Sequence, residues 1–291
     1  MKNIDLTAAP FPDYELLDSG GNRKLERFAG HLVIRPETQA VWRPHDLSYW
    51  KNAEAEFRWS EGKGAWRGKK IPEPWEMKWN DARFLLRLTS FKHTGVFPEQ
   101  ASNWEWMGER IAHLRGRSGG AETRVLNLFG YTGAASVIAA LRGAQVTHVD
   151  ASKQSNAWAR ENAGRSGAAE GIRYITDDAF KFAEREVRRG ASYEGIIVDP
   201  PAFGRGAKGE VWRIEEQLLP LLEILKKLIT PKPGSFFILN GYAAGYSPRS
   251  FAQAAESAFG KIENGEFGEL AIAEKDSGRV VPSGIYVRFY N

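Results

Sequence analysis

The stretch TRVLNLFGYTGAASVIAALRGAQVTHVDAS, residues 123–152, sets the fold of the second half of the chain. It opens with a short apolar run, turns at GYTG, and continues as a helix-forming segment that Gly143 ends. A second apolar run, 144–150, follows directly. Two short strands joined by a helix predict a right-handed crossover, in which the two strands lie parallel.

The same alternation continues towards the C-terminus. Further strands are predicted at 172–179, 193–203 and 234–242, and helices at 155–167, 179–190, 215–229 and 249–260. The last stretch, 267–291, reads as two strands with no helix between them, which predicts an antiparallel hairpin at the sheet edge. The predicted fold class is therefore α/β: a Rossmann-like, doubly wound, mostly parallel sheet with an antiparallel C-terminal edge hairpin.

The first half of the chain has a different texture. Short apolar runs separated by turn residues, as in 14–36 and 75–91, predict a small β-rich domain. Helical spacing begins at residue 103. We therefore expect a β-rich N-terminal domain, residues 1–102, as a candidate for substrate binding, followed by the α/β domain, residues 103–291.

Tryptophan gathers in the first half of the chain. Large rings in a small β domain usually form its core, and this is the interpretation of four of them: Trp42, Trp50, Trp75 and Trp79. Trp59 and Trp66 flank a short run with four cations, Lys63, Arg67, Lys69 and Lys70, in a segment that reads as a hairpin tip or loop. Rings beside cations suit nucleic-acid binding, whereas a solvated loop is the simpler alternative.

Ligands of open α/β sheets bind at the carboxyl ends of the strands, so the residues there carry the functional prediction. The first loop has Gly130 and Gly133 in the pattern Gly-x-x-Gly, which differs from the dinucleotide and phosphate-loop patterns and disfavours a phosphate-bearing ligand. Asp150 ends the second strand, 20 residues after Gly130, at the offset where an acid commonly binds ribose hydroxyls.

Two more acidic positions follow at strand ends. Asp178 comes after the third strand, where a helix N-cap is a strong alternative to a binding role. Asp199 precedes Pro200 and Pro201, which remove two backbone N–H donors and hold the chain extended. This Asp-Pro-Pro segment favours the rim of an active site over a plain turn.

Taken in order, VLNLFGYTGAAS, VTHVDAS, ITDDAF and IIVDPPAFGRG resemble the motifs of class I S-adenosylmethionine-dependent methyltransferases. They are most similar to the bacterial ribosomal RNA large-subunit methyltransferase family. The resemblance covers roughly residues 91–291, including TGVFPEQ before the α/β domain. Four motifs in this order are specific for the cofactor and much less specific for the substrate.

The resemblance implies a role for each matching residue. Asp150 would take the ribose hydroxyls, and Asp178 with Ala179 would meet the adenine. The loop that would wrap the methionine part of S-adenosylmethionine consists of Phe129, Gly130, Tyr131, Thr132 and Gly133. The catalytic rim, where the methyl group meets its acceptor, would consist of Asp199, Pro200, Pro201 and Phe203.

Three positions within the resemblance have open interpretations. Phe97 and Gln100 would close over the cofactor, or belong to a packed linker. Asn127 stands where the family usually has an acid, so it would hold the methionine ammonium through its amide oxygen, with one charge contact fewer. Phe203 would stack on an extruded base, or pack beneath its own loop.

The chain of 291 residues contains no cysteine, and this limits the chemistry. Methylation of pyrimidine C5 normally needs a cysteine thiolate that activates the ring. An RNA acceptor is therefore expected to be nitrogen or oxygen rather than pyrimidine C5. The five histidines lack metal-ligand spacing, so no metal is expected, and His148, inside a strand, is expected to be a core residue.

Net charge and hydrophobicity restrict the possible partners and location of the protein less than the motifs restrict its chemistry. A net charge of +4 is compatible with a polyanionic partner without requiring one. There is no apolar run of membrane-spanning length, and acidic residues stand where a signal peptide would be apolar, so a cytoplasmic protein without membrane contact is expected.

Three functions fit these observations. The first is a methyltransferase acting on ribosomal or other structured RNA. The second is a small-molecule methyltransferase, with the N-terminal domain as a lid. The third is a cofactor-binding RNA assembly factor without turnover. The sequence indicates neither the target nucleotide nor the oligomeric state.

Overall fold

The computed structural model describes residues 1–8, 10–60, 63–117, 122–206, 209–242 and 245–291. Contacts divide the chain into two compact units. Unit 1 comprises Met1–Leu6, Asn103–Leu270 and Gly284–Asn291, and unit 2 comprises Thr7–Ser102 and Ala271–Ser283. The main boundary thus falls between Ser102 and Asn103. Both ends of the chain belong to unit 1, and the segment Ala271–Ser283 returns to unit 2.

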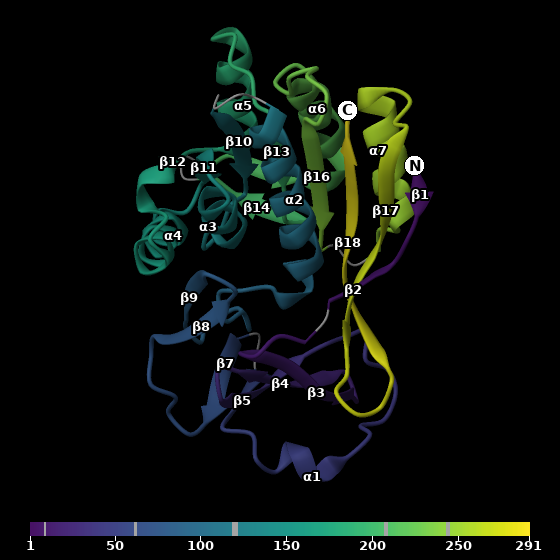
Figure 1. Ribbon diagram of the computed structural model, residues 1–291. Helices are drawn as coiled ribbons and strands as arrows, with labels where there is room; N and C mark the ends of the chain where they lie inside the picture. Colours follow the sequence, from purple (N-terminus) through teal and green to yellow (C-terminus); the bar gives the residue numbers. More distant parts are fainter. Residues whose placement is uncertain (9, 61–62, 118–121, 207–208, 243–244) are drawn as a thin grey trace. The chain divides into compact units, whose positions relative to one another are not determined.

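Unit 1 is built on a sheet that has nine strands among the described residues. Its order is β1-β17-β18-β16-β13-β10-β11-β12, with β2 also paired to β17 (Figure 1). The central parallel strands are β10 (Thr123–Leu128), β11 (Ala144–Asp150), β12 (Ile172–Thr176), β13 (Gly195–Val198) and β16 (Phe236–Gly241). The helices are α2 (Ala101–Arg117), α3 (Ala134–Leu141), α4 (Lys153–Ser166), α5 (Ala179–Arg188), α6 (Ile214–Lys226) and α7 (Pro248–Phe259).

The alternation of side chains along each strand separates the two faces of this sheet. Leu126 and Leu128 of β10 join a buried apolar cluster with residues of α5, α6 and α7, including Phe182, Leu221 and Phe251. The intervening Asn127 points to the other face, where it bonds Ser136 of α3. Helices therefore cover both faces, and the predicted doubly wound α/β fold is confirmed.

The C-terminal pair is β17 (Asn264–Ala273) and β18 (Val280–Tyr290). β18 runs antiparallel to β16, and only a six-residue connection separates β17 from its neighbour β18, so these two are also antiparallel. The predicted hairpin is therefore present. The edge itself is formed by the first strands of the chain, because β1 (Lys2–Asn3) and β2 (Leu6–Ala8) pair with β17.

Unit 2 contains a five-stranded sheet in the order β3-β4-β5-β6-β7 and a two-stranded sheet of β8 and β9. Their bounds, with the short helix α1, are β3 (Tyr14–Gly20), β4 (Arg23–Phe28), β5 (His31–Pro36), α1 (Leu47–Trp50), β6 (Ala55–Ser60), β7 (Lys63–Gly68), β8 (Trp75–Trp79) and β9 (Ala82–Leu86). A single 3-10 turn, Pro98–Gln100, precedes α2. The β-rich character predicted for this part of the chain is confirmed.

Two details of the N-terminal prediction are corrected. Residues 63–68 are strand β7, paired along their whole length with β6, and the interpretation of this run as a loop is wrong. The hairpin tip, residues 61–62, lies outside the described residues. Trp75 and Trp79 are buried core residues as predicted. Trp42 and Trp50 are only half-buried, and their indole N–H groups donate to Ser19 and Asp18.

Candidate functional site

The register of the parallel strands brings four strand ends together. Leu128 is aligned with Val149 on one side and with Val198 on the other, and Asp150 is aligned with Thr176. The residues that follow these positions therefore leave the sheet at one edge. This edge collects the loop after β10, Asp150, the acids after β12 and the Asp-Pro-Pro segment after β13.

The loop after β10 has an unusual backbone. Phe129 and Tyr131, which are not glycines, adopt left-handed φ angles of 57° and 49°. Gly133 also has a left-handed φ, of 83°, and begins α3 as its N-cap. Left-handed non-glycine residues are uncommon and strained, and they concentrate at functional sites. The sequence marked this loop through its glycines, but not the strain at its aromatic residues.

Gly130 is required by the packing of the loop. A Cβ atom at this position would lie 2.3 Å from the imidazole of His148, because the loop crosses directly over that ring. His148 is fully buried, as the sequence predicted, and its Nδ1 lies 2.9 Å from Oγ of Ser136. Burial, with a smaller contribution from the positive charge of Arg160, lowers the pKa of His148 to about 4. The ring is therefore neutral at pH 7 and supports the loop as an uncharged surface.

Asp150 is held in position by backbone groups. Its Oδ2 accepts from the N–H of Tyr131 and its Oδ1 from the N–H of Ser152, both at 2.8 Å. Burial raises the pKa of its carboxyl, and these two N–H groups oppose the shift. Each carboxylate oxygen has a further lone pair, so the side chain can still accept from two hydroxyl groups of a ligand.

Asn127 is buried beneath the loop. Its Nδ2 donates to Oγ of Ser136 at 2.8 Å. Among the described residues, no group donates a hydrogen bond to its amide oxygen, the atom that the family resemblance assigns to the methionine ammonium. The orientation of the amide therefore agrees with the role expected from the sequence without testing it.

The two acids after β12 both interact with α5. Oδ1 of Asp178 accepts from the N–H of Lys181, and Asp178 is the N-cap of α5, which begins at Ala179. The alternative interpretation of Asp178 as a helix cap is thus correct. A contact with adenine can use only the carboxylate lone pairs that the cap leaves free. Asp177 forms an ion pair with Arg185.

The Asp-Pro-Pro segment continues into a small hairpin that the sequence did not indicate. β14 (Phe203–Arg205) pairs antiparallel with β15 (Val211–Arg213). Trp212 is buried on its inner side, where the indole N–H donates to the carbonyl of Pro201 at 2.6 Å. The same ring lies 4.9 Å from the ring of Phe129, centroid to centroid. Trp212 therefore joins the loop after β10 to the segment after β13.

Phe203 is 54% exposed. The alternative that it packs beneath its own loop is therefore wrong, and its ring is available on the surface, four residues along the chain from the half-buried Asp199.

Phe97 and Gln100 belong to unit 2, whereas the other predicted site residues belong to unit 1. Phe97 packs edge-on against His93, with ring centroids 5.1 Å apart, and precedes the 3-10 turn that contains Gln100. Their role at the cofactor remains a prediction.

Two residues of the edge were missed by sequence reasoning. One is Trp212, whose only signal was its rarity in the second half of the chain. The other is Asn156 of α4, whose Nδ2 donates to the carbonyl of Asp150 and to Oγ1 of Thr176, at 2.9 and 3.0 Å. Asn156 thereby fixes the ends of β11 and β12. No local pattern distinguishes such an asparagine from a surface residue of the helix.

The groups gathered at this edge suit a particular kind of ligand. They comprise a half-buried carboxylate, an amide oxygen and a strained loop flanked by aromatic rings, and none of the predicted contact residues is a cation. A carboxylate that can accept from two hydroxyls fits a ribose, and the absence of cations among these residues does not favour a phosphate. The residues present therefore fit S-adenosylmethionine, a nucleoside with a methionine chain.

Another cavity of the described chain has a different character. A polar cavity of about 370 Å³ lies at the opposite edge of the sheet, beside the first residues of β10, β11 and β12. Within the described ranges, no cluster of three or more potential metal ligands occurs. Nor does any described helix combine the length and the apolar character needed to cross a membrane.

Comparison with known proteins agrees with this site. Residues 53–254 match the family described as S-adenosylmethionine-dependent methyltransferase. A crystal structure of an S-adenosylmethionine-dependent methyltransferase from Agrobacterium tumefaciens is 38% identical, with a TM-score of 0.92, over 99% of this chain and 93% of that one. A second structure, a putative methyltransferase from Streptococcus mutans, is 19% identical with a TM-score of 0.71, over 97% of this chain and 76% of that one, and shares the fold.

Among curated proteins, the chain is similar to the ribosomal RNA large subunit methyltransferase K/L of Shewanella sp. strain MR-4. The two are 34% identical over 154 residues, which is 52% of this chain and 20% of that protein. The similarity thus spans about a fifth of the relative's length. The family match, the full-length similarity to the Agrobacterium enzyme and the geometry of the sheet edge together lead to one conclusion: the chain belongs to the S-adenosylmethionine-dependent methyltransferases, and its cofactor is S-adenosylmethionine.

Proposed function

We propose that this enzyme methylates a nitrogen or oxygen atom of a nucleotide in structured RNA, and that ribosomal RNA is the substrate to test first. The observation that carries the proposal is the exposed ring of Phe203, four residues after Asp199, in the segment that follows β13 at the edge where the predicted cofactor residues converge. The similarity to ribosomal RNA large subunit methyltransferases supports the substrate class. Such RNA is present in the cytoplasm, which is therefore the location that we propose.

The residue roles follow from the site. Asp150 would hold the ribose of the cofactor, the amide oxygen of Asn127 its ammonium group, and the loop from Phe129 to Gly133 its methionine chain. Asp178 and Ala179, at the start of α5, would border the adenine.

The reaction requires little acid or base catalysis. Bound S-adenosylmethionine supplies an electrophilic methyl group on a positively charged sulfur. Displacement needs the acceptor atom, the methyl carbon and the sulfur on one line, so the protein contributes mainly by orientation. Phe203 would stack on the extruded base, while Asp199 and the carbonyl groups that precede and follow Pro200 would accept from an exocyclic N–H. An amine oriented in this way presents its lone pair to the methyl group.

The lack of cysteine supports nitrogen or oxygen as the acceptor atom. Methylation at C5 of a pyrimidine would need a nucleophile that adds to the ring, normally a thiolate. No side chain of this type is available anywhere in the chain.

The proposal is tested by incubating the protein with labelled S-adenosylmethionine and unmodified ribosomal RNA, followed by nucleoside mass spectrometry. We expect one nucleoside methylated on nitrogen or oxygen. Formation of 5-methylcytosine or 5-methyluridine would contradict the acceptor assignment. RNA that binds without acquiring a methyl group would favour an assembly factor, and neither binding nor methylation would favour a small-molecule substrate.

A further inference from the structure

The β14–β15 hairpin has two different faces. In an antiparallel pair, residues directly opposite each other share a face. Gly204 and Trp212 are opposite each other and form the inner face. The other two opposite pairs form the outer face, which we call the hairpin face: Phe203 with Arg213, and Arg205 with Val211. All four of these side chains are exposed.

The inner face fixes the hairpin to the rest of unit 1. Besides the hydrogen bond from Trp212 to Pro201, the N–H of Ile214 donates to the carbonyl of Ala202 at 3.1 Å. On the other side, Nζ of Lys181 in α5 lies 2.8 Å from a carboxylate oxygen of Glu210. The hairpin face is therefore held in a set position next to the acceptor rim.

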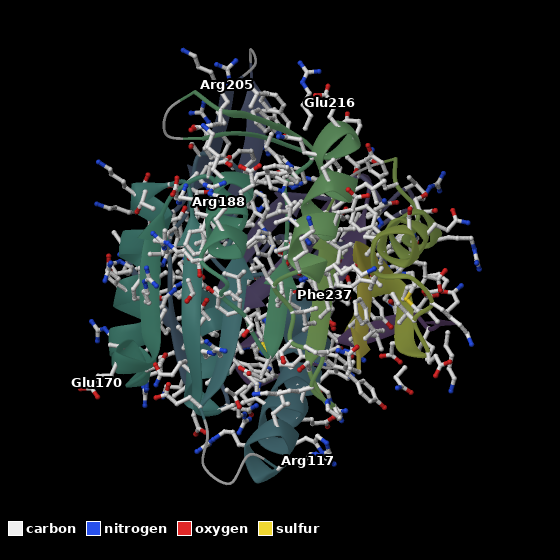
Figure 2. The ribbon with its side chains drawn as sticks, turned by 90° about the horizontal axis from the view of Figure 1, so that it is seen from above. Arg117, Glu170, Arg188, Arg205, Glu216 and Phe237 are labelled. Carbon is white, nitrogen blue, oxygen red and sulfur yellow. The ribbon has the colours of Figure 1, made fainter. Side chains whose placement is uncertain are left out.

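The two arginines of the hairpin face are available for a new partner. Within the described residues, the side chain of Arg205 forms no ion pair or hydrogen bond. Arg213 is 3.9 Å from Glu216, and both of these side chains are more than half exposed. A long, exposed ion pair of this kind contributes little. Figure 2 shows Arg205 and Glu216 at the margin of the view, whereas Phe237 lies in its middle, among the core side chains.

The composition of the face matches a single nucleic-acid strand. Arg205 and Arg213 lie on one diagonal of the hairpin, and Phe203 and Val211 on the other. Guanidinium groups bind phosphates in a two-pronged geometry, and rings stack on bases of any sequence. A face built only to be soluble would not need an exposed phenylalanine and an exposed valine between two arginines.

Building on the proposed function, we propose that the hairpin face binds the RNA strand beside the acceptor nucleotide. Arg205 and Arg213 contact phosphates on the two sides of that nucleotide, and Val211 covers the neighbouring ribose or base. Phosphate contacts position a strand without reading its sequence. The hairpin thereby sets the distance between the backbone of the RNA and the methyl group, independently of which base is methylated.

The test compares two double variants with equal loss of charge. The first is Arg205→Gln with Arg213→Gln. The matched control is Arg117→Gln with Arg188→Gln, which removes two exposed arginines from the ends of α2 and α5, away from the carboxyl edge of the sheet. For each we measure KM and kcat with ribosomal RNA, RNA affinity against salt concentration, calorimetric affinity for S-adenosylhomocysteine, and thermal midpoint.

We expect the hairpin variant to raise KM about tenfold or more and to reduce the slope of log affinity against log salt by roughly 1.4–1.8, the amount for two phosphates. S-adenosylhomocysteine affinity and thermal midpoint stay unchanged, and the control resembles the wild type. If the hairpin variant keeps the wild-type KM and slope, or if the control loses as much, the inference is overturned. Wild-type protein that neither binds nor methylates RNA overturns the proposed function as well, which distinguishes the two failures.

Discussion

Asp150 holds the fold in place and keeps the capacity to bind a ligand. It accepts the N–H of Tyr131, which helps to hold the strained loop, and it has lone pairs left for ribose hydroxyls. The sequence predicted this residue from its offset after Gly130. It could not predict the bond to Tyr131, because that bond depends on a left-handed turn in a loop that no local pattern specifies.

Replacing Asp150 by alanine is expected to weaken the binding of S-adenosylhomocysteine by ~1–3 kcal/mol, because buried hydroxyls lose a charged acceptor. Isothermal calorimetry measures this loss. Glu170→Ala removes an exposed carboxylate next to the first residue of β12, at the other edge of the sheet, and serves as the control with unchanged affinity. Equal affinities for all three proteins would remove Asp150 from the cofactor site.

His148 gives a prediction about pH. Its pKa is lowered to about 4 in the folded protein, mainly by burial, against ~6.5 in an unfolded chain. Between these values the unfolded state binds more protons, so this residue makes the free energy of unfolding fall as the pH falls, by at most ~1.4 kcal/mol per pH unit. NMR of the imidazole C–H protons should show no titration of His148 from pH 8 to pH 5. A midpoint near the ordinary value would contradict the buried, neutral ring.

At the scale of elements, the long periodic segments were predictable and the short ones were not. The strand ends with their acids were found because each apolar run is followed directly by a polar one. β14 and β15 have three residues each, too few to show a period, and their pairing depends on Trp212 packing against Phe129. In β7 the residues glycine and lysine favour a loop, but pairing with β6 overrides that preference.

The tip of the β17–β18 hairpin belongs to unit 2 and is held there by charge. Arg279 donates to Asp18 through Nη2 and to Glu274 through Nε, both at 2.8 Å. Asp18 is fully buried, and it also accepts from the backbone N–H groups of His45 and Asp46 and from the indole of Trp50. Nothing in residues 271–283 indicates by itself that they pair with a segment more than 200 residues earlier.

Replacing Arg279 by alanine leaves two buried carboxylates without their shared cation. Breaking such a pair typically costs ~3–5 kcal/mol, and the partial exposure of Arg279 reduces the expected loss to about 2–3 kcal/mol. Chemical denaturation measures the loss for the unfolding transition of unit 2. Lys261→Ala, which breaks an exposed pair with Glu263, is the control and should change stability by less than ~0.5 kcal/mol. Equal stability of the two variants would show that the ion pairs of Arg279 do not stabilise unit 2.

At the scale of the whole molecule, the cofactor site was the part most open to prediction. Its residues in unit 1 lie within one continuous stretch from Asn127 to Phe203, and strand order alone brings them to one edge. The substrate side was harder, because binding surfaces depend on which side chains remain exposed after folding. Trp59 is an example: its place beside the basic run left two interpretations open, and only the structure shows it 58% exposed.

The exposed cations of unit 2 offer the last prediction. Lys63 and Arg67 are exposed on β7, Lys69 and Lys70 follow it, and within the described residues none of the four forms an ion pair. Trp66, by contrast, is half-buried and donates its indole N–H to the carbonyl of Thr89 at 2.8 Å, so it supports the strand. The cations are thus left for a partner, whereas Trp59, which is opposite Gly64, projects from the other face of the sheet to Lys63 and Arg67.

Replacing all four cations by alanine should weaken RNA binding and flatten its salt dependence, each lost phosphate contact lowering the slope by ~0.7–0.9. Affinity for S-adenosylhomocysteine should not change, because the acids and the loop that we propose to hold the cofactor belong to unit 1. Filter binding across a salt series and calorimetry measure the two quantities on the same protein. A quadruple variant with the wild-type slope would mean that β7 is a solvated edge strand, and RNA recognition would then rest on unit 1 alone.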